Sequence, residues 1–410
     1  MTAIKKIIVS IHLGGQEIEL GELLSEGKRI YFKYYSSFID RGIEISPFKL
    51  KLSDQLHYAK EIPFDGLFGV FADSLPDGWG RLLLDRTLTS RGISIQEITP
   101  LDRLSYVGTK GMGALIYRPE MDSDFSESKK IELDSIAQAT NHILKGTSSD
   151  VLEELFQLGG SSGGARPKIL VGYNSTLDQL THGEEDLPKD YEHWLIKFSA
   201  SSDRKDSANI EYAYYKMAID AGIEMNESKL FKSDSGNVYF GTKRFDRVNN
   251  KRLHLHSAAG LMHDNFRLSN IDYGDLMDGS FKLENHVRAY ENILRMAAFN
   301  VFAHNRDDHS KNFSFLMDEI GKWKLAPAYD LTFSTSTHGM HSTMVSGESQ
   351  NPSKKHLMEL VDYFKINKGL EIIQKVQDVT SSWKFYAAQS GVEKESESII
   401  GKTMLRVAKK

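Results

Sequence analysis

The sequence predicts an α+β, two-lobed fold, in which a strand-rich N-terminal region is followed by a mostly helical C-terminal lobe. Early in the chain, short runs of β-branched and aromatic residues lie between glycines, as is typical of strands. A glycine-rich loop then separates helix-like from strand-like segments. Beyond residue 255 the apolar residues recur at helical spacing. No internal repeat or long low-complexity tract indicates another architecture.

Composition limits the class of protein. The 410 residues, 40% hydrophobic and 26% charged, allow two or three domains and a sizeable core. No apolar run is long enough to span a bilayer, and the N-terminus is too poor in apolar residues for a secretory signal. The absence of cysteine excludes disulfides and thiolate metal sites and is typical of a reducing compartment. We therefore expect a cytoplasmic protein without membrane contact, whose net charge of -5 gives no general attraction to nucleic acid.

The strand-rich first domain is expected to cover residues 1–120. Its predicted strands are residues 5–13, 17–20, 29–35 and 113–117. A turn formed by Pro76 and Gly78 leads to a helix that we expect to begin within residues 82–86. The polar stretch 121–130 is typical of a surface connection and marks the boundary of the domain.

The second domain, residues 131–250, is expected to mix helices and strands. We predict helices at 131–144, 150–158 and from 207 to about 222, and strands at 169–172, 193–198 and within 237–245. The first two of these strands are interpreted as a hairpin with a long, mobile connection through residues 174–190. Either Asp206 or Ser207 is suited to cap the helix that follows.

The third domain, residues 251–410, is expected to be mostly helical. Its predicted helices are residues 273–276, 286–303, 354–363, 367–389 and 393–408.

The most informative stretch is Asn305-Arg-Asp-Asp-His-Ser-Lys-Asn312. Asp307 and Asn312 have the D-x-x-x-x-N spacing of a phosphoryl-transfer loop, and a second acid, Asp330, follows the turn Ala-Pro-Ala-Tyr. One carboxylate would orient the attacking hydroxyl, while the amide oxygen and the second carboxylate would hold Mg²⁺ against nucleotide phosphates. This spacing alone is common, so its weight depends on the segments upstream.

A glycine-rich loop, Gly159-Gly-Ser-Ser-Gly-Gly164, leads through Ala165, Arg166, Pro167 and Lys168 into an apolar strand. Glycines allow backbone N–H groups to approach phosphate oxygens closely. A Walker A loop would end in Gly-Lys-Ser/Thr, which disfavours a P-loop NTPase. The alternative to a nucleotide loop is a flexible surface turn, which the direct passage from Pro167 and Lys168 into the strand disfavours.

Lys197 lies in a predicted strand, where it would share a face with Leu195. Downstream, Glu211 shares a helical face with Tyr215 and Ala218, and a carboxylate there is costly unless it is paired. A strand lysine followed by a helix glutamate is the ion pair by which kinases set a lysine against the α and β phosphates. A solvated lysine, or a structural salt bridge with no role at the nucleotide, is the alternative interpretation.

Two other enzyme classes are disfavoured. His304 and His309 flank the acidic stretch, but they lack the i, i+4 spacing and the third ligand of a zinc hydrolase. Ser161 and Ser162 lack the G-x-S-x-G context of a hydrolase nucleophile.

Together, these segments resemble the HipA toxins, serine/threonine kinases of bacterial type II toxin–antitoxin modules. The matching pieces are Phe71-Ala-Asp-Ser-Leu-Pro-Asp-Gly-Trp-Gly80, Gly163-Gly-Ala-Arg-Pro-Lys168, His193 to Phe198, Lys243-Arg-Phe-Asp-Arg247, Asp307-Asp-His-Ser-Lys-Asn312 and Leu325-Ala-Pro-Ala-Tyr-Asp330. They cover nearly the whole chain in the family's order, and the resemblance implies a kinase-like fold.

The resemblance implies catalytic and metal-binding roles. Asp307 corresponds to the catalytic aspartate, with His309 and Lys197 as further catalytic groups. Asn312 and Asp330 correspond to the ligands of Mg²⁺.

The resemblance also implies an ATP site and a site of autophosphorylation. Residues expected around ATP are Gly163, Gly164, Ala165, Arg166, Pro167, Lys168, Lys197, Glu211, His309, Lys311, Asn312 and Asp330, together with the hinge Lys243, Arg244 and Phe245, whose backbone would meet adenine. The family phosphorylates a serine at the start of the glycine loop, and Ser161 is the closest match, with Ser162 adjacent to it.

The function that the resemblance implies is transfer of the ATP γ-phosphoryl group to a Ser or Thr of a cytoplasmic protein. The implied substrate class is the aminoacyl-tRNA synthetases, the glutamyl enzyme among them. A small helix-turn-helix antitoxin is the implied partner, and DNA would be contacted only through it.

Two alternative functions remain open. The chain could be an antitoxin-bound co-repressor or pseudokinase with little catalysis, although intact Lys197, Asp307, Asn312 and Asp330 favour an active enzyme. It could also be a kinase of a lipid or small molecule, and the lack of a basic amphipathic stretch disfavours the lipid.

Overall fold

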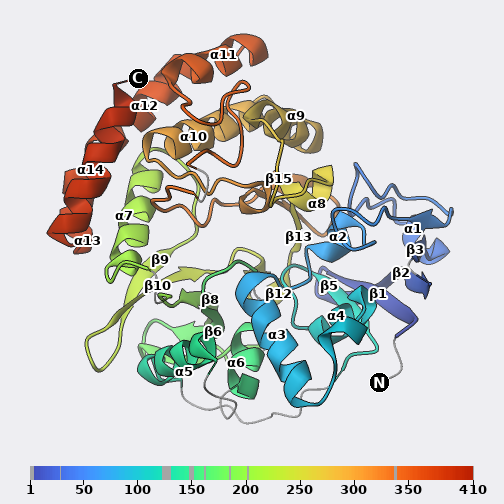
Figure 1. The fold of residues 1–410 in the computed structure, drawn as a ribbon. Helices are drawn as coiled ribbons and strands as arrows, with labels where there is room; N and C mark the ends of the chain where they lie inside the picture. The colour runs from blue at the N-terminus through green and yellow to red at the C-terminus, as the bar shows by residue number, and fades with distance from the viewer. Residues whose placement is uncertain are drawn as a thin grey trace. The chain divides into compact units, whose positions relative to one another are not determined.

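The structure, a computed structural model, describes residues 4–27, 29–121, 131–146, 152–160, 163–183, 186–200, 203–336 and 339–409. The chain forms two compact units. The first unit comprises residues 1–203, 231–256 and 316–321, and the second comprises residues 204–230, 257–315 and 322–410. The α+β class predicted from the sequence is confirmed, with most strands in the first unit (Figure 1).

The N-terminal sheet of the first unit has the strand order β4-β3-β2-β1-β5, and its neighbouring strands are antiparallel. Its strands are β1 (Lys6–Leu13), β2 (Gln16–Glu26), β3 (Arg29–Tyr34), β4 (His57–Tyr58) and β5 (Leu115–Arg118). The helices of this region are α1 (Ser36–Ile39), α2 (Gly69–Ala72), α3 (Gly78–Ser90) and α4 (Pro100–Val107), with a 3-10 turn at Ile95–Glu97. The predicted strands are confirmed, but α3 begins directly in the Pro76–Gly78 turn.

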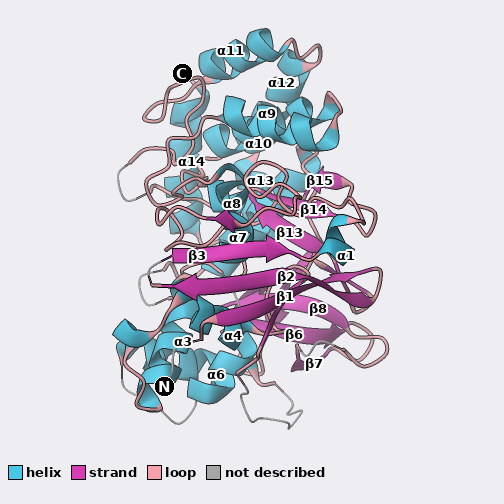
Figure 2. Ribbon diagram, turned by 90° about the vertical axis from the view of Figure 1, so that its right-hand side faces the viewer, coloured by secondary structure: helices cyan, strands magenta, loops and turns pink. Residues whose placement is uncertain are grey.

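A second sheet has the strand order β7-β6-β8-β10-β9. Its strands, in magenta in Figure 2, are β6 (Lys168–Asn174), β7 (Gln179–His182), β8 (Glu192–Lys197), β9 (Ser228–Lys232) and β10 (Val238–Lys243). The short strands β11 (Arg247–Val248) and β12 (Lys251–Arg252) form a hairpin, and β13 (His254–Ser257), β14 (Ser314–Met317) and β15 (Trp323–Leu325) form a further sheet.

The two faces of the second sheet differ in chemistry. On one face, Ile169 and Val171 of β6 and Trp194 and Ile196 of β8 are buried in a core with α5 (Leu133–Lys145) and α6 (Leu152–Gly159). Side chains alternate along a strand, so the residues between them belong to the opposite face. That opposite face carries two lysines, which become important for the candidate site below.

The second unit is built around α10 (Arg288–Phe302), whose residues 296–302 are all buried. This helix contacts α9 (Tyr273–Glu284), α11 (Lys354–Phe364), α12 (Gly369–Ser381) and α14 (Lys394–Ala408). The other helices are α7 (Ser207–Asp220), α8 (Ala258–Met262) and α13 (Trp383–Ser390), with a 3-10 turn at Ser310–Asn312. Among the described residues, none of the helices is long and apolar enough to cross a membrane.

Two local predictions were wrong and one strand was missed, whereas the predicted antiparallel pairing of β6 with β8 is confirmed. Residues 174–190 are not a plain connection, because Asn174 Oδ1 accepts hydrogen bonds from the amides of Thr176 and Leu177 and turns the chain into β7. The predicted helix 367–389 is two helices that meet at Ser382. Strand β9 was not predicted.

The predicted cap of α7 is also wrong. Asp206 precedes the helix, but its carboxylate accepts hydrogen bonds from the Glu393 amide (2.9 Å) and the Ser396 hydroxyl (3.0 Å) instead of capping α7. The residue is buried, so contacts with a distant segment replaced the local one. Such a long-range competitor for a polar side chain leaves no signal in the local sequence.

Two histidines of the first unit are buried in their neutral form. His254 Nε2 lies 2.9 Å from the Ile45 carbonyl oxygen, and burial lowers the pKa of His254 to about 4. Burial and the guanidinium groups of Arg244 and Arg247 lower the pKa of His193 to about 4. Both folded pKa values lie below the ordinary value of about 6.5. The unfolded state therefore binds protons more tightly than the folded state. The contribution of these groups to the free energy of unfolding is fully present above about pH 6.5 and is lost as the pH falls towards 4.

We expect the His254→Gln variant to be less sensitive to acid than the natural protein. Each neutral histidine costs about 2 kcal/mol of stability at pH 5 relative to pH 7, because the unfolded state binds the proton more tightly. Urea unfolding at pH 7 and pH 5, followed by circular dichroism, measures the difference. Gln keeps a donor for the Ile45 carbonyl but cannot titrate. An equal loss of stability in both proteins between the two pH values would contradict the burial of a neutral His254.

Candidate active site

The acidic loop of the second unit follows directly from the end of α10. His304 adopts a left-handed backbone conformation (φ 55°), which turns the chain out of the helix. The loop then pairs with the segment around Ser334, since the Ser334 amide donates to the His304 carbonyl (3.1 Å) and the Arg306 amide donates to the Ser334 carbonyl (3.3 Å). The pairing is a single parallel bridge between Asn305 and Ser334.

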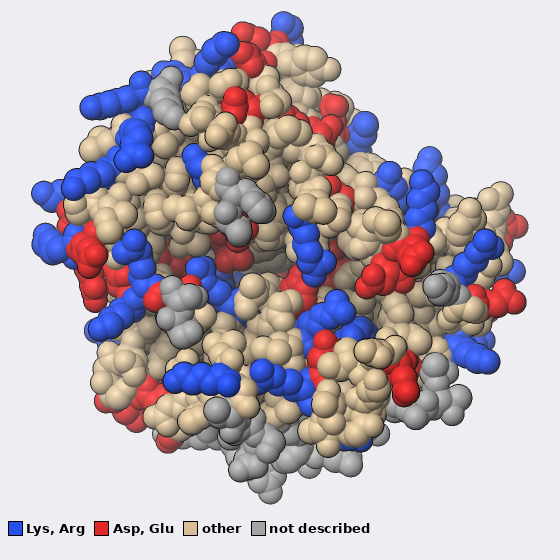
Figure 3. Space-filling view, viewed as in Figure 1, with Lys and Arg blue, Asp and Glu red and all other residues tan. Residues whose placement is uncertain are grey.

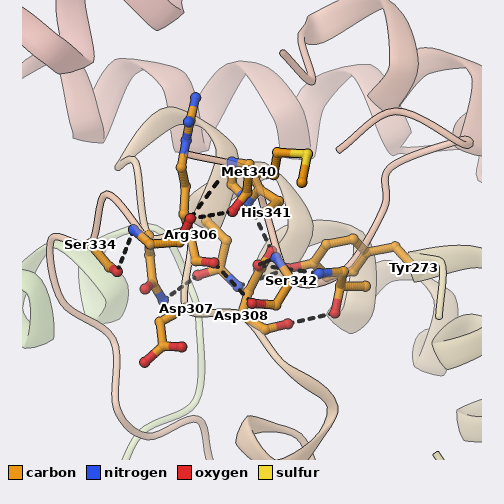
Figure 4. Close-up of polar contacts among 12 residues, drawn as sticks. Tyr273, Arg306, Asp307, Asp308, Ser334, Met340, His341 and Ser342 are labelled. Carbon is orange, nitrogen blue, oxygen red and sulfur yellow. Dashed lines mark hydrogen bonds and ion pairs between the residues drawn. The ribbon is translucent and has the colours of Figure 1, made fainter. Parts of the chain in front are cut away.

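Asp308 faces inward and is 1% exposed. One of its oxygens accepts hydrogen bonds from the Tyr273 hydroxyl (2.9 Å) and His341 Nδ1 (3.0 Å), and the other accepts one from the Ser342 amide (2.8 Å) (Figure 4). A buried carboxylate is very costly unless such donors replace water. Burial and the Asp308 carboxylate raise the pKa of Tyr273 well above its ordinary value, so the hydroxyl stays protonated and donates.

The hydrogen bonds continue from Tyr273 into the end of α10. The Asn300 side-chain amide donates to the Tyr273 hydroxyl oxygen (2.8 Å), and the Asn305 side-chain amide donates to Asn300 Oδ1 (3.0 Å). All of these side chains are buried. The network thus connects the start of the acidic loop, the end of α10 and the start of α9 through buried polar contacts.

Asp307 faces the other way. Its side chain is 61% exposed, and Figure 4 shows its carboxylate pointing away from the contacts of Asp308. The backbone oxygen of Asp307 accepts a hydrogen bond from the Asn312 side-chain amide (2.8 Å), which closes the loop. His309 Nε2 lies 3.9 Å from Asp307 Oδ1. The loop therefore presents one carboxylate to solvent on a backbone that is fixed from inside.

Asn312 and Asp330 belong to adjoining segments. The Tyr329 hydroxyl donates to the Lys311 carbonyl oxygen (2.5 Å) and lies 2.6 Å from the Ser314 hydroxyl, so it connects the two segments directly. Asp330 adopts a left-handed conformation (φ 57°), which is uncommon for a residue other than glycine and is typical of functional positions.

Carboxylate and amide oxygens suit Mg²⁺, which usually takes one or two protein ligands together with substrate phosphates. Asp330 and Asn312 are such a pair, and the amide nitrogen of Asn312 is already used within the loop. Among the described residues, no group of three or more His, Asp or Glu side chains forms a self-sufficient metal site. Asn312 and Asp330 therefore fit a metal ion whose remaining ligands come from a phosphate.

His309 and Lys311 lie against the ring of Phe266. The His309 and Phe266 ring centroids are 5.5 Å apart, and Lys311 Nζ lies 4.8 Å from the Phe266 centroid. Between them, the Ser310 hydroxyl donates to Asp264 (2.5 Å). Sequence reasoning missed Phe266 and Asp264, because nothing in their local pattern distinguishes them from ordinary loop residues.

The glycine loop and the predicted lysines belong to the first unit. Lys168 is 6% exposed, and its Nζ donates to the Gly163 carbonyl oxygen (2.6 Å). Gly164 has φ 90°, a conformation that favours glycine. Ala165 and Arg166 are exposed, Pro167 is buried, and Arg166 forms an ion pair with Asp203 (3.1 Å). Ser161 and Ser162 lie outside the described residues.

Lys197 is directly opposite Lys168 on the paired strands β8 and β6, so both belong to the same face of the sheet. Phe240 of β10 is opposite Lys197 on its other side, and Lys197 Nζ lies 5.8 Å from the Phe240 ring centroid. Like charges on directly opposed positions destabilise a sheet. A face with two neighbouring ammonium groups is therefore suited to an anion with several negative charges, such as a polyphosphate.

The predicted hinge follows β10. The Arg244 amide donates to the His193 carbonyl oxygen (2.8 Å), and the Lys243 side chain pairs with Glu192. Phe245 is half-buried. Asp246, which sequence reasoning missed, is fully buried, and the Arg244 and Arg247 guanidinium groups hold its pKa below its ordinary value against the opposing effect of burial.

Glu211 is a buried residue of α7 in the second unit, whereas Lys197 belongs to the first. Their ion pair stays a prediction. The second unit therefore carries Asp307, Asn312 and Asp330, and the first carries the glycine loop and the lysines.

Comparison with known proteins agrees with these motifs. Residues 10–118 match the family model of the HipA N-terminal domain, and residues 160–383 match that of the HipA-like C-terminal domain. The chain therefore belongs to the HipA family. No curated protein matches the sequence.

Two solved structures are similar to this chain to different extents. The HipA of Shewanella oneidensis MR-1, determined in complex with HipB and its operator DNA, is similar over 97% of this chain and 94% of its own, with a TM-score of 0.66 and 17% sequence identity. A Helicobacter pylori proinflammatory kinase, CtkA, matches 52% of this chain and 91% of its own, with a TM-score of 0.34 and 13% identity. The first match shows that the fold of the chain is that of HipA.

We expect the Asp308→Asn variant to lose about 2–4 kcal/mol of stability, because an amide replaces one anionic acceptor with a donor in a buried network of donors. The loss should be concentrated in the second unit, with faster hydrogen exchange in residues 304–312. Thermal unfolding and hydrogen-exchange mass spectrometry measure both effects. Asp362→Asn, on the exposed side of α11, is the matched control. Unchanged exchange in this loop would show that Asp308 does not fix it.

Proposed function

We propose that this protein is an ATP- and Mg²⁺-dependent serine/threonine protein kinase that acts as a HipA-type toxin in the cytoplasm. The observation that carries the proposal is the arrangement of the acidic loop. An exposed carboxylate, Asp307, stands on a backbone that is held by buried Asp308 on one side and by Asn312 on the other. Phosphoryl transfer depends on positioning and electrostatics, and such a loop supplies positioning.

In the proposed reaction, Asp307 accepts a hydrogen bond from the Ser or Thr hydroxyl of the substrate and takes its proton as the oxygen attacks the γ-phosphorus. Asn312 and Asp330 would hold Mg²⁺, which when bound neutralises charge on the phosphates. Lys197, on the face that it shares with Lys168, would bind the α and β phosphates. His309 and Lys311 would contact the phosphates from the acidic loop.

The resemblance to the family supports further proposed roles. Glu211 would orient Lys197, residues 163–168 would enclose phosphates, and the backbone of residues 243–245 would bind adenine. Autophosphorylation would fall on Ser161 or Ser162. The substrate would be a cytoplasmic protein, such as an aminoacyl-tRNA synthetase of the glutamyl type.

The partner would be a small helix-turn-helix antitoxin. The S. oneidensis relative was solved with HipB and operator DNA. The net charge here is -5, and on the face in Figure 3 basic and acidic side chains are interspersed. We therefore propose that DNA is contacted through the partner. A co-repressor or pseudokinase with little catalysis is the competing function, and the fixed, exposed Asp307 favours catalysis over it.

We expect Asp307→Ala to reduce phosphoryl transfer by at least about a thousandfold while the fold stays intact, because the residue is exposed and its backbone contacts remain. Purified protein is incubated with Mg²⁺ and γ-labelled ATP, and label on residues 159–168 is located by mass spectrometry. Asp362→Ala is the control and should transfer normally. Normal labelling of the Asp307 variant would remove this residue from the mechanism. Absence of label from unmodified natural protein that binds ATP would favour the co-repressor.

A further inference from the structure

The glycine loop of the first unit is held by a turn from the N-terminal domain. The carboxylate of Asp77 accepts a hydrogen bond from the Gly164 amide. Two residues later, the Trp79 amide donates to the Gly164 carbonyl oxygen (3.0 Å), and the Trp79 indole N–H donates to the Lys168 carbonyl oxygen (3.2 Å). Three backbone groups, the Gly164 amide, the Gly164 carbonyl and the Lys168 carbonyl, are therefore bound by this turn.

The contact depends on two glycines, because the backbones approach closely at both positions. Gly78 has φ 45°, and a Cβ atom at this position would lie 2.4 Å from the Gly164 carbonyl oxygen. At the end of α6, a Cβ at Gly159 would lie 2.4 Å from the Lys168 carbonyl oxygen, which is the group that the Trp79 indole binds. Glycine is required at both positions because the two backbones approach too closely for a side chain. The turn and the loop are thus complementary in shape as well as in hydrogen bonding.

Asp77 stands at a position where a carboxylate ordinarily serves its own helix. It precedes α3, and an aspartate there usually accepts a hydrogen bond from an amide of the first helical turn. In the described part of the chain, the Asp77 side chain makes no such capping hydrogen bond with α3. It is directed to the loop amide instead.

The chemistry of this contact is that of an anion at a phosphate-binding loop. An oxygen with negative charge bound to a glycine-loop amide is what a nucleotide phosphate would provide. The nearby ammonium group is engaged as well, because Lys168 Nζ donates to the Gly163 carbonyl oxygen (2.6 Å). In this structure, the Gly164 amide and the Lys168 ammonium group are therefore both bound by groups of the protein itself.

We propose that Asp77 is a positioning residue that takes the place of a phosphate oxygen at the Gly164 amide and thereby lowers the affinity for nucleotide. This inference rests on the proposed function. To bind that amide, a phosphate must displace the carboxylate, and it must also approach a negative charge that lies at the loop. The N-terminal domain thus sets the ATP affinity of a loop that belongs to the C-terminal domain.

The isosteric variant Asp77→Asn separates charge from structure. The side-chain oxygen of Asn can still accept the Gly164 hydrogen bond, but the negative charge is gone. We expect the Kd of Mg-ATP, measured by isothermal titration calorimetry, to fall about tenfold. The Kd of adenosine, which has no phosphates, should not change. The difference in the Kd of Mg-ATP between Asp77→Asn and the natural protein should be smaller at high salt, because salt screens the charge of Asp77.

A second variant tests the contact without ATP. Gly78→Ala places a Cβ against the Gly164 carbonyl and should release the loop. Hydrogen-exchange mass spectrometry of residues 163–168 should show faster exchange in Gly78→Ala and nearly natural protection in Asp77→Asn. Natural protection in Gly78→Ala would overturn the contact itself.

The outcomes for ATP are also distinct. Unchanged or weaker Mg-ATP binding by Asp77→Asn, with normal binding by the natural protein, would overturn the role of Asp77 and leave the kinase proposal standing. Absence of Mg-ATP binding by the natural protein and by both variants would overturn the proposed function, and this inference with it.

Discussion

The candidate site of the second unit depends on the burial of the Asp308 carboxylate. Removing this charge from water costs free energy. The hydrogen bonds from the Tyr273 hydroxyl, the His341 ring and the Ser342 amide offset that cost. The donors come from two segments, the start of α9 and residues 341–342, so the carboxylate is satisfied only when both segments are in place. The requirement fixes the backbone of the acidic loop and directs the next carboxylate, Asp307, to solvent.

An opposite constraint operates in the first unit. There, Lys168 and Lys197 occupy directly opposed positions on one face of a sheet, and the repulsion between them destabilises the fold unless negative charge lies nearby. The Asp77 carboxylate is bound to the Gly164 amide of the glycine loop that precedes Lys168. Two cations on opposed positions cost stability, and such a cost is often found at functional sites.

Much of this was accessible from the sequence. Local patterns can be recognised in the sequence alone. They include the spacing of Asp307 and Asn312, the glycine loop and the alternation around Lys197. The strands at 5–13 and 193–198 were predicted within a residue or so, because their β-branched and aromatic residues match the strand period. Predictions failed where a distant partner replaced a local one. The Asp206 carboxylate, which was expected to cap α7, accepts hydrogen bonds from Glu393 and Ser396 instead.

The sequence by itself determined the family and the α+β class, and it predicted the charged groups of a phosphoryl-transfer site. It did so because these depend on residue type and on short spacings. Only the tertiary structure decided which of two adjacent aspartates is buried, that two lysines share a face, and that Asp77 serves a loop rather than its own helix. Each of these depends on which distant segments pack together. The partners that those segments supply determine the free energy of burying a charge and of bringing two backbones close together.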